Sequence, residues 1–187
     1  MPGTPGDKSN GEASWNPQVP EPSRKIIELP VLELTAERFA PYGSVIAPME
    51  DGVPSGVEDA PLDLSAGTPR FYAMRIPARG LTVTHITRHR RVTQMLASVG
   101  GQTWFLAVAP PLAVDDPKAE PALGDISAFR IPGNVGVLLH KGSWHAGPLF
   151  EAGEQSFFNL ELTDTNVVDH HTSDLVARYG CALRLRV

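Results

Sequence analysis

The sequence lacks the features that would direct it to an oxidising compartment, a membrane or a nucleic acid. It has a single cysteine, Cys181, so no disulfide can form within the chain. No segment approaches the roughly 20 apolar residues that span a bilayer, and residues 1–22 contain no apolar signal segment. The formal net charge of −5 at pH 7 disfavours a nucleic-acid partner. We therefore expect a cytoplasmic protein that binds neither membranes nor nucleic acids.

Short catalytic signatures are absent as well. No HExxH, CxxC or His-x-His cluster indicates a metal site. No GxSxG motif indicates a serine hydrolase, and no GxxxxGK[ST] motif indicates a phosphate-binding loop. Any active site must therefore be assembled from residues that lie far apart in the sequence.

Turn-forming residues, in contrast, are abundant: the 187 residues include 18 prolines and 17 glycines. From residue 70 onward they separate short segments with the alternation of β-strands, which is clearest in Leu183–Val187. Turn signals every eight to twelve residues or so favour a sandwich or barrel, and they leave no room for the helices of a parallel α/β fold. The sequence predicts an all-β, mainly antiparallel barrel or jelly roll with a few short helices.

The domain organisation follows from composition. Residues 1–24 are rich in Pro, Gly, Ser and Asn and predict a flexible tail, whereas residues 25–187 predict a single catalytic domain. Thr35 is the expected N-cap of one short helix, and Thr172–Tyr179 predicts another, capped by Thr172 or Ser173.

Two further predictions concern strand pairing. Gly100-Gly101 predicts a tight hairpin between strands at residues 93–98 and 102–109. An open barrel leaves strand edges that need cover, so we expect a homodimer, with Leu183–Val187 as the candidate cover.

Among the six histidines, His145 stands out. It follows a strand and the turn Lys141-Gly-Ser-Trp144, a position that predicts a side chain at the mouth of a barrel. His140 begins the same turn and is a weaker candidate. His85 and His89 lie four residues apart, roughly 13 Å on a strand, too far to share a metal without a bend. His170-His171 predicts a surface or interface pair.

Four blocks of the sequence resemble the ureidoglycolate lyase family, a branch of the cupin superfamily. They are Phe39–Ile46, Ile86–Gln94, Val108–Pro110 and Phe129–Leu149, in matching order over roughly residues 30–180. The last block, which contains Gly142-Ser-Trp-His145, is the most specific. The resemblance implies a cupin-like barrel and a lyase that cleaves ureidoglycolate to glyoxylate and urea in allantoin and purine breakdown.

The resemblance also implies roles for individual residues. His145 is expected to be a general acid or base, with His89 as its partner. Because the substrate carries a carboxylate, a basic side chain is expected to hold it. Substrate-binding roles fall to the following residues: Arg70 or Lys141 for the carboxylate, Gln94 for the ureido group, and Trp144.

Many cupins hold a divalent metal, so the resemblance also allows nickel, manganese or zinc. The expected ligands are His89, Gln94 and His145, with His140 less favoured, and such a metal would act as a Lewis acid.

The chain departs from the family pattern at Thr87, Arg90 and Ala146-Gly147, where the family commonly has Glu, Pro and His. Two alternatives follow from these departures. One is a cupin enzyme for a different small hydroxy or keto acid. The other is a cupin without catalytic activity that binds a small carboxylate.

Overall fold

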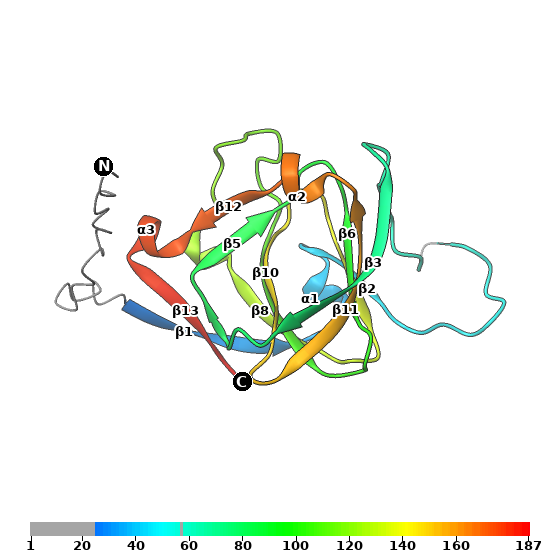
Figure 1. Ribbon diagram of the computed structural model, residues 1–187, viewed down its shortest axis with the longest axis horizontal. Coiled ribbons are helices and arrows are strands. Elements are labelled where there is room, and N and C mark those ends of the chain that lie inside the picture. Colours follow the sequence, from blue (N-terminus) through cyan, green and yellow to red (C-terminus); the bar gives the residue numbers. More distant parts are fainter. Residues whose placement is uncertain (1–24, 57) are drawn as a thin grey trace, which may run out of the picture.

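The computed structural model describes residues 25–56 and 58–187 (Figure 1). The tail predicted for residues 1–24 lies outside the described residues, so it stays a prediction.

Two curled sheets contain the described strands. The larger sheet has eight strands, in the order β12 (His171–Asp174), β5 (His85–Arg88), β10 (Trp144–Leu149), β7 (Trp104–Ala109), β8 (Ser127–Ile131), β1 (Lys25–Glu33), β13 (Cys181–Arg186) and β4 (Thr82–Val83). The smaller sheet has five, in the order β2 (Gly43–Ile46), β9 (Gly136–Leu139), β6 (Gln94–Ser98), β11 (Glu154–Leu162) and β3 (Pro69–Pro77). Figure 1 shows the two sheets enclosing a common interior.

Helical structure in the described chain is limited to short segments. These are α1 (Ala36–Phe39), a 3₁₀ turn (Leu123–Asp125), α2 (Thr165–Val168) and α3 (Leu175–Tyr179). Thr35 caps α1 as predicted, because its side chain accepts a hydrogen bond from the Arg38 N–H at 3.2 Å. The second predicted helix begins later than expected, since Asp174 caps α3 while residues 171–174 form β12. None of the described helices has the length and apolarity needed to cross a membrane.

Antiparallel pairing dominates both sheets. The exceptions among the described strands involve β1, which pairs in parallel with β13 and with β8. The all-β, mainly antiparallel, cupin-like fold is therefore confirmed. The parallel pairs join distant parts of the sequence, which local alternation does not reveal.

The alternation of side chains on β7 divides the core into two parts. All six of its residues are buried. Phe105, Ala107 and Ala109 belong to a cluster that contains α3 and β13 residues. Trp104, Leu106 and Val108 belong to a cluster with β6, β9 and β11 of the smaller sheet. The second cluster therefore lies between the two sheets, in the interior of the barrel.

The predicted hairpin at Gly100-Gly101 is wrong. β6 pairs with β9 and β11, whereas β7 pairs with β10 and β8, so these glycines carry the chain from one sheet to the other. The physical reason is that β7 is buried on both faces and therefore needs a central position in its own sheet.

The prediction that Leu183–Val187 covers an exposed strand edge in a homodimer is also wrong. β13 is already paired on both edges, with β1 and β4. Leu183 and Leu185 are buried in the chain's own core, so they are not available to a partner.

Candidate active site

His145 lies on the inner face of β10, toward the smaller sheet. Its register partner on β7 is Val108, a member of the cluster between the sheets. Its neighbour Trp144 pairs with Ala109 and belongs to the other cluster. Because adjacent residues of a strand face opposite sides, His145 points into the barrel interior and Trp144 points away from it.

His89 is held beside His145 by backbone contacts. The His89 carbonyl accepts from the Gly142 N–H at 2.6 Å, which ties the His89 segment to the turn that precedes His145. His89 Nδ1 lies 2.5 Å from the Asp169 carbonyl oxygen. The Asp169 carboxylate accepts from the Arg90 and Arg91 N–H groups at 2.8 and 2.7 Å. The His89 and His145 ring centroids are consequently 5.2 Å apart.

These hydrogen bonds define the tautomers of both rings. A carbonyl oxygen only accepts, so His89 Nδ1 carries the proton that it donates to Asp169. His145 Nδ1 faces the Ser143 carbonyl at 3.4 Å in the same way. In both neutral rings Nε2 is therefore the unprotonated nitrogen, able to accept a proton or bind a metal.

Both rings are uncharged at neutral pH. Burial, with a smaller contribution from neighbouring His89, lowers the pKa of His145 to about 3. Burial also lowers the pKa of His89, although its bond to the Asp169 carbonyl opposes that change. At pH 7 the barrel interior thus holds two neutral imidazoles, each with one unprotonated ring nitrogen.

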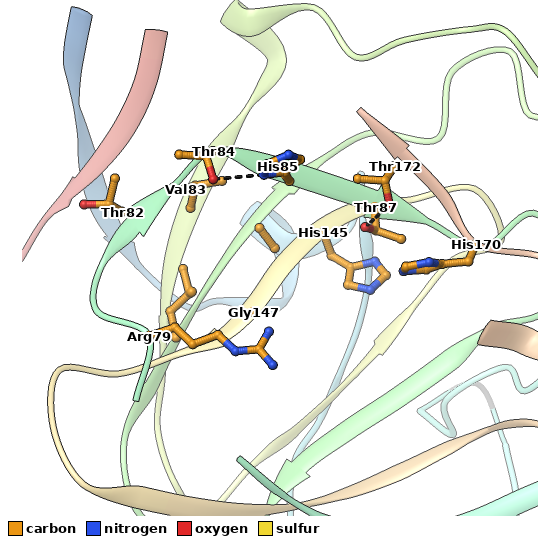
Figure 2. A pocket seen from close by; sticks show the side chains of 12 residues that line it. Arg79, Thr82, Val83, Thr84, His85, Thr87, His145, Gly147, His170 and Thr172 are labelled. Carbon is orange, nitrogen blue, oxygen red and sulfur yellow. Dashed lines mark hydrogen bonds between the residues drawn. The ribbon is translucent and has the colours of Figure 1, made fainter. Parts of the chain in front are cut away.

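Two cavities open on His145. One, of about 540 Å³, is drawn in Figure 2, where His145 and His170 lie side by side with Thr87 and Thr172 nearby. The other, of about 180 Å³, lies between the sheets. His145, Gly147 and Arg79 line both cavities. Gly147 has φ +144° and sits at an irregularity of the β10–β7 pairing, a backbone conformation that disfavours any side chain.

The smaller cavity has a polar inner wall from β3, β6 and β11. Gln94 Nε2 donates to Asn159 Oδ1 at 3.2 Å and to Glu161 Oε2 at 3.1 Å. Tyr72 donates to Glu161 at 3.2 Å and accepts from Asn159 at 3.0 Å. Because Glu161 requires the NH₂ end of Gln94, the opposite atom, Gln94 Oε1, has no partner among the described residues. Gln94 is also one of the residues that line this cavity together with His145.

The expected metal ligands are brought only partly together. The rings of His89 and His145 are neighbours, and Gln94 shares the smaller cavity with His145. Within the described part of the chain, however, no three His, Cys, Asp or Glu side chains converge as metal ligands. Catalytic zinc usually has three such protein ligands, so the donor set falls short of that pattern and we derive no step through a metal. His140 lies outside both cavities and contacts the Ala40 carbonyl at 3.3 Å.

Three of the expected substrate contacts do not line either cavity. Trp144 packs on the outer side of β10, with the Arg88 guanidinium 4.7 Å from its ring. Lys141 is paired with Asp63, a contact that lowers the pKa of that carboxyl. Arg70 lies over the Tyr72 ring at 3.8 Å and is 3.9 Å from Glu161. Each of these three side chains already has a partner in the folded chain, and the substrate-binding roles expected for them stay predictions.

Sequence reasoning missed several residues of the site. Asn159 and Glu161 share a strand face with buried Phe157, so alternation alone could have marked them as polar groups pointing inward. His170 is exposed, as expected for a surface residue, and it also lines the larger cavity, with its ring centroid 5.8 Å from that of His89. Asp169 contacts His89 and Arg79 lines both cavities only because the folded chain brings them there, so no local sequence signal identifies either residue.

The fold and site together define a class: a cupin-like barrel with a neutral histidine facing a polar interior cavity. Comparison with known families then identifies the group. Residues 26–177 match the ureidoglycolate lyase family model, and the chain therefore belongs to that family, a family of lyases. No curated protein matches the sequence significantly.

Proposed function

We propose that this protein is a carbon–nitrogen lyase that cleaves ureidoglycolate to glyoxylate and urea in the breakdown of allantoin and purines. One observation carries the proposal: a neutral, buried His145 lines a cavity together with Gln94, whose amide oxygen has no partner among the described residues. Membership of the ureidoglycolate lyase family supports it.

Gln94 favours a substrate with N–H donors. A ureido group carries N–H bonds, and one of them can satisfy Gln94 Oε1, whose burial without a partner is unfavourable. A hydroxy acid without nitrogen offers only its hydroxyl there, and a keto acid has a carbonyl, which donates no hydrogen bond. This contact therefore favours ureidoglycolate over the simpler acids among the alternatives.

The position of His145 in the cavity with Gln94 assigns it the one proton transfer that the reaction requires. The hydroxyl and the ureido nitrogen of ureidoglycolate are attached to the same carbon. When Nε2 of His145 takes the hydroxyl proton, the C–O bond becomes the carbonyl of glyoxylate and the C–N electron pair leaves with the nitrogen. The imidazolium then returns the proton to that nitrogen, which completes urea without water or an oxidant.

His89 acts in this scheme as a positioning residue. Being neutral as well, it places no second positive charge beside the transient His145 imidazolium. A charged neighbour would oppose protonation of His145 and slow the first proton transfer.

The test is release of urea and glyoxylate by the purified protein, compared with buffer alone. We expect equal amounts of both products and a loss of kcat of about 100-fold or more in His145→Asn. The matched control is His140→Asn, which alters a histidine outside both cavities and should retain the wild-type rate. Tight glyoxylate binding without turnover would support the non-catalytic alternative, and a wild-type rate in His145→Asn would move the chemistry elsewhere.

We also propose that the protein acts in the cytoplasm as a homodimer. The support for a dimer is the outer edge of β3, which has no neighbour among the described strands. Phe71 on β3 is 59% exposed and stacks on Phe158 of β11, which leaves an apolar patch beside that edge. An antiparallel edge can pair with its own copy across a two-fold axis.

A further inference from the structure

Arg79 is an exposed residue that lines both cavities, and the backbone on either side of it is held in place. It lies in the short connection between β3 and β4, and hydrogen bonds hold that connection at both ends. The Ala78 N–H donates to Gly153 O at 2.9 Å, and the Leu81 carbonyl accepts from the Leu185 N–H at 2.9 Å. In Figure 2 the Arg79 side chain extends from this connection toward the part of the cavity that contains His145.

Arg79 is the basic group best placed to meet a ligand anion. Among the described residues that line the two cavities, it is the sole arginine or lysine. It takes part in none of the ion pairs found in the described chain. The two basic residues expected from sequence to hold the carboxylate, Arg70 and Lys141, already contact Glu161 and Asp63.

The charges of the smaller cavity set the direction in which a ligand binds. Glu161 is fully buried at its polar wall, next to Gln94. A substrate carboxylate placed there would face another carboxylate at short range, which is unfavourable in a partly desolvated site. The ureido end, which donates hydrogen bonds, suits this wall, and the carboxylate end is directed toward Arg79.

We infer that Arg79 binds the substrate carboxylate and so determines specificity for an α-substituted carboxylic acid. The inference rests on the proposed function for the identity of the substrate. With the carboxylate on Arg79 and the ureido group on Gln94, the carbinol carbon lies between them, on the side of His145. Guanidinium binds carboxylate through two parallel N–H bonds, which fixes the orientation as well as the position of the acid.

The experiment compares Arg79→Met with Arg75→Met in the full-length protein. Arg75 is a matched control because it lies on β3, is exposed and pairs with Glu154 away from both cavities. Calorimetry with glyoxylate should show binding weakened roughly 10- to 100-fold in Arg79→Met and unchanged in Arg75→Met. Arg79→Lys should recover part of the loss, since lysine keeps the charge without the paired geometry.

Kinetics distinguish a binding role from a structural one. For ureidoglycolate, Arg79→Met should raise KM by a similar factor while kcat changes much less. For the neutral primary amide of ureidoglycolate, wild type and Arg79→Met should behave alike. Wild-type glyoxylate affinity in Arg79→Met would overturn the inference even if the enzyme turns over ureidoglycolate.

The experiments distinguish failure of the proposed lyase function from failure of the carboxylate-binding role of Arg79. If the wild-type protein binds glyoxylate but releases no urea, the lyase proposal fails, whereas a loss of glyoxylate binding in Arg79→Met would still support the role of Arg79. If the wild-type protein binds neither glyoxylate nor ureidoglycolate, the carboxylate-binding role of Arg79 is overturned.

Discussion

Replacing His145 with asparagine should change how the stability of the protein depends on pH. The folded protein holds His145 neutral, with its pKa lowered to about 3, whereas in the unfolded chain the pKa returns to its ordinary 6.5. Between these two values the unfolded state binds a proton that the folded state does not. His145 therefore destabilises the wild-type fold as the pH falls below 6.5, and this effect is complete near the folded-state pKa.

The size of the effect follows from the two pKa values. At about pH 7.5 the contribution is close to zero, and at about pH 5 protonation of the unfolded chain costs the fold about 2 kcal/mol. Asparagine does not titrate, so His145→Asn escapes this loss. Relative to wild type, the variant should therefore gain about 2 kcal/mol in unfolding free energy between the two pH values.

Urea denaturation followed by tryptophan fluorescence measures this difference. Both proteins are unfolded at about pH 7.5 and about pH 5, and the stability gap between them is compared. All other titrating groups are present in both proteins, so the contributions of those that do not contact His145 cancel in the comparison. A gap that changes by less than about 0.5 kcal/mol would refute the neutral, buried state of His145 and the proton-transfer scheme built on it.

Three further predictions concern the scaffold, the metal and the assembly. Arg88→Leu should lower the unfolding free energy by about 2–4 kcal/mol, because Arg88 is fully buried and donates to loop carbonyls. In the same denaturation assay, the control Arg91→Leu should lower it by under about 0.5 kcal/mol, because Arg91 is exposed. Turnover should survive dialysis against a chelator, since no metal enters the His145 scheme, and a loss restored by added nickel or manganese would contradict that scheme. Light scattering should give the mass of two chains for the wild type and a shift toward one chain for Phe71→Lys, whereas a single-chain mass for the wild type would rule out the dimer.

The local pattern predicted most of the fold because β alternation and turn residues act over short distances. The strands at residues 94–98, 104–109 and 181–186 lie where the sequence predicted them, and Thr35 caps its helix. Pairing was harder to predict, since it depends on which strands need burial on two faces. The glycines at 100–101 resemble a hairpin turn locally, but the burial of β7 on both faces places it in a different sheet from β6.

For the site, the turn at a strand end made His145 a candidate, and the family resemblance added His89 and Gln94. The structure places the ring of His89 beside that of His145, and Gln94 lines a cavity together with His145. The choice of the basic residue depended on tertiary structure, because an arginine or lysine can hold a ligand only if its charge is not already engaged. Arg70 and Lys141 have acidic neighbours that are far away in sequence, and the folded chain leaves Arg79 facing the cavity. The neutral state of His145 was likewise decided by the fold, since burial between two sheets is what lowers its pKa.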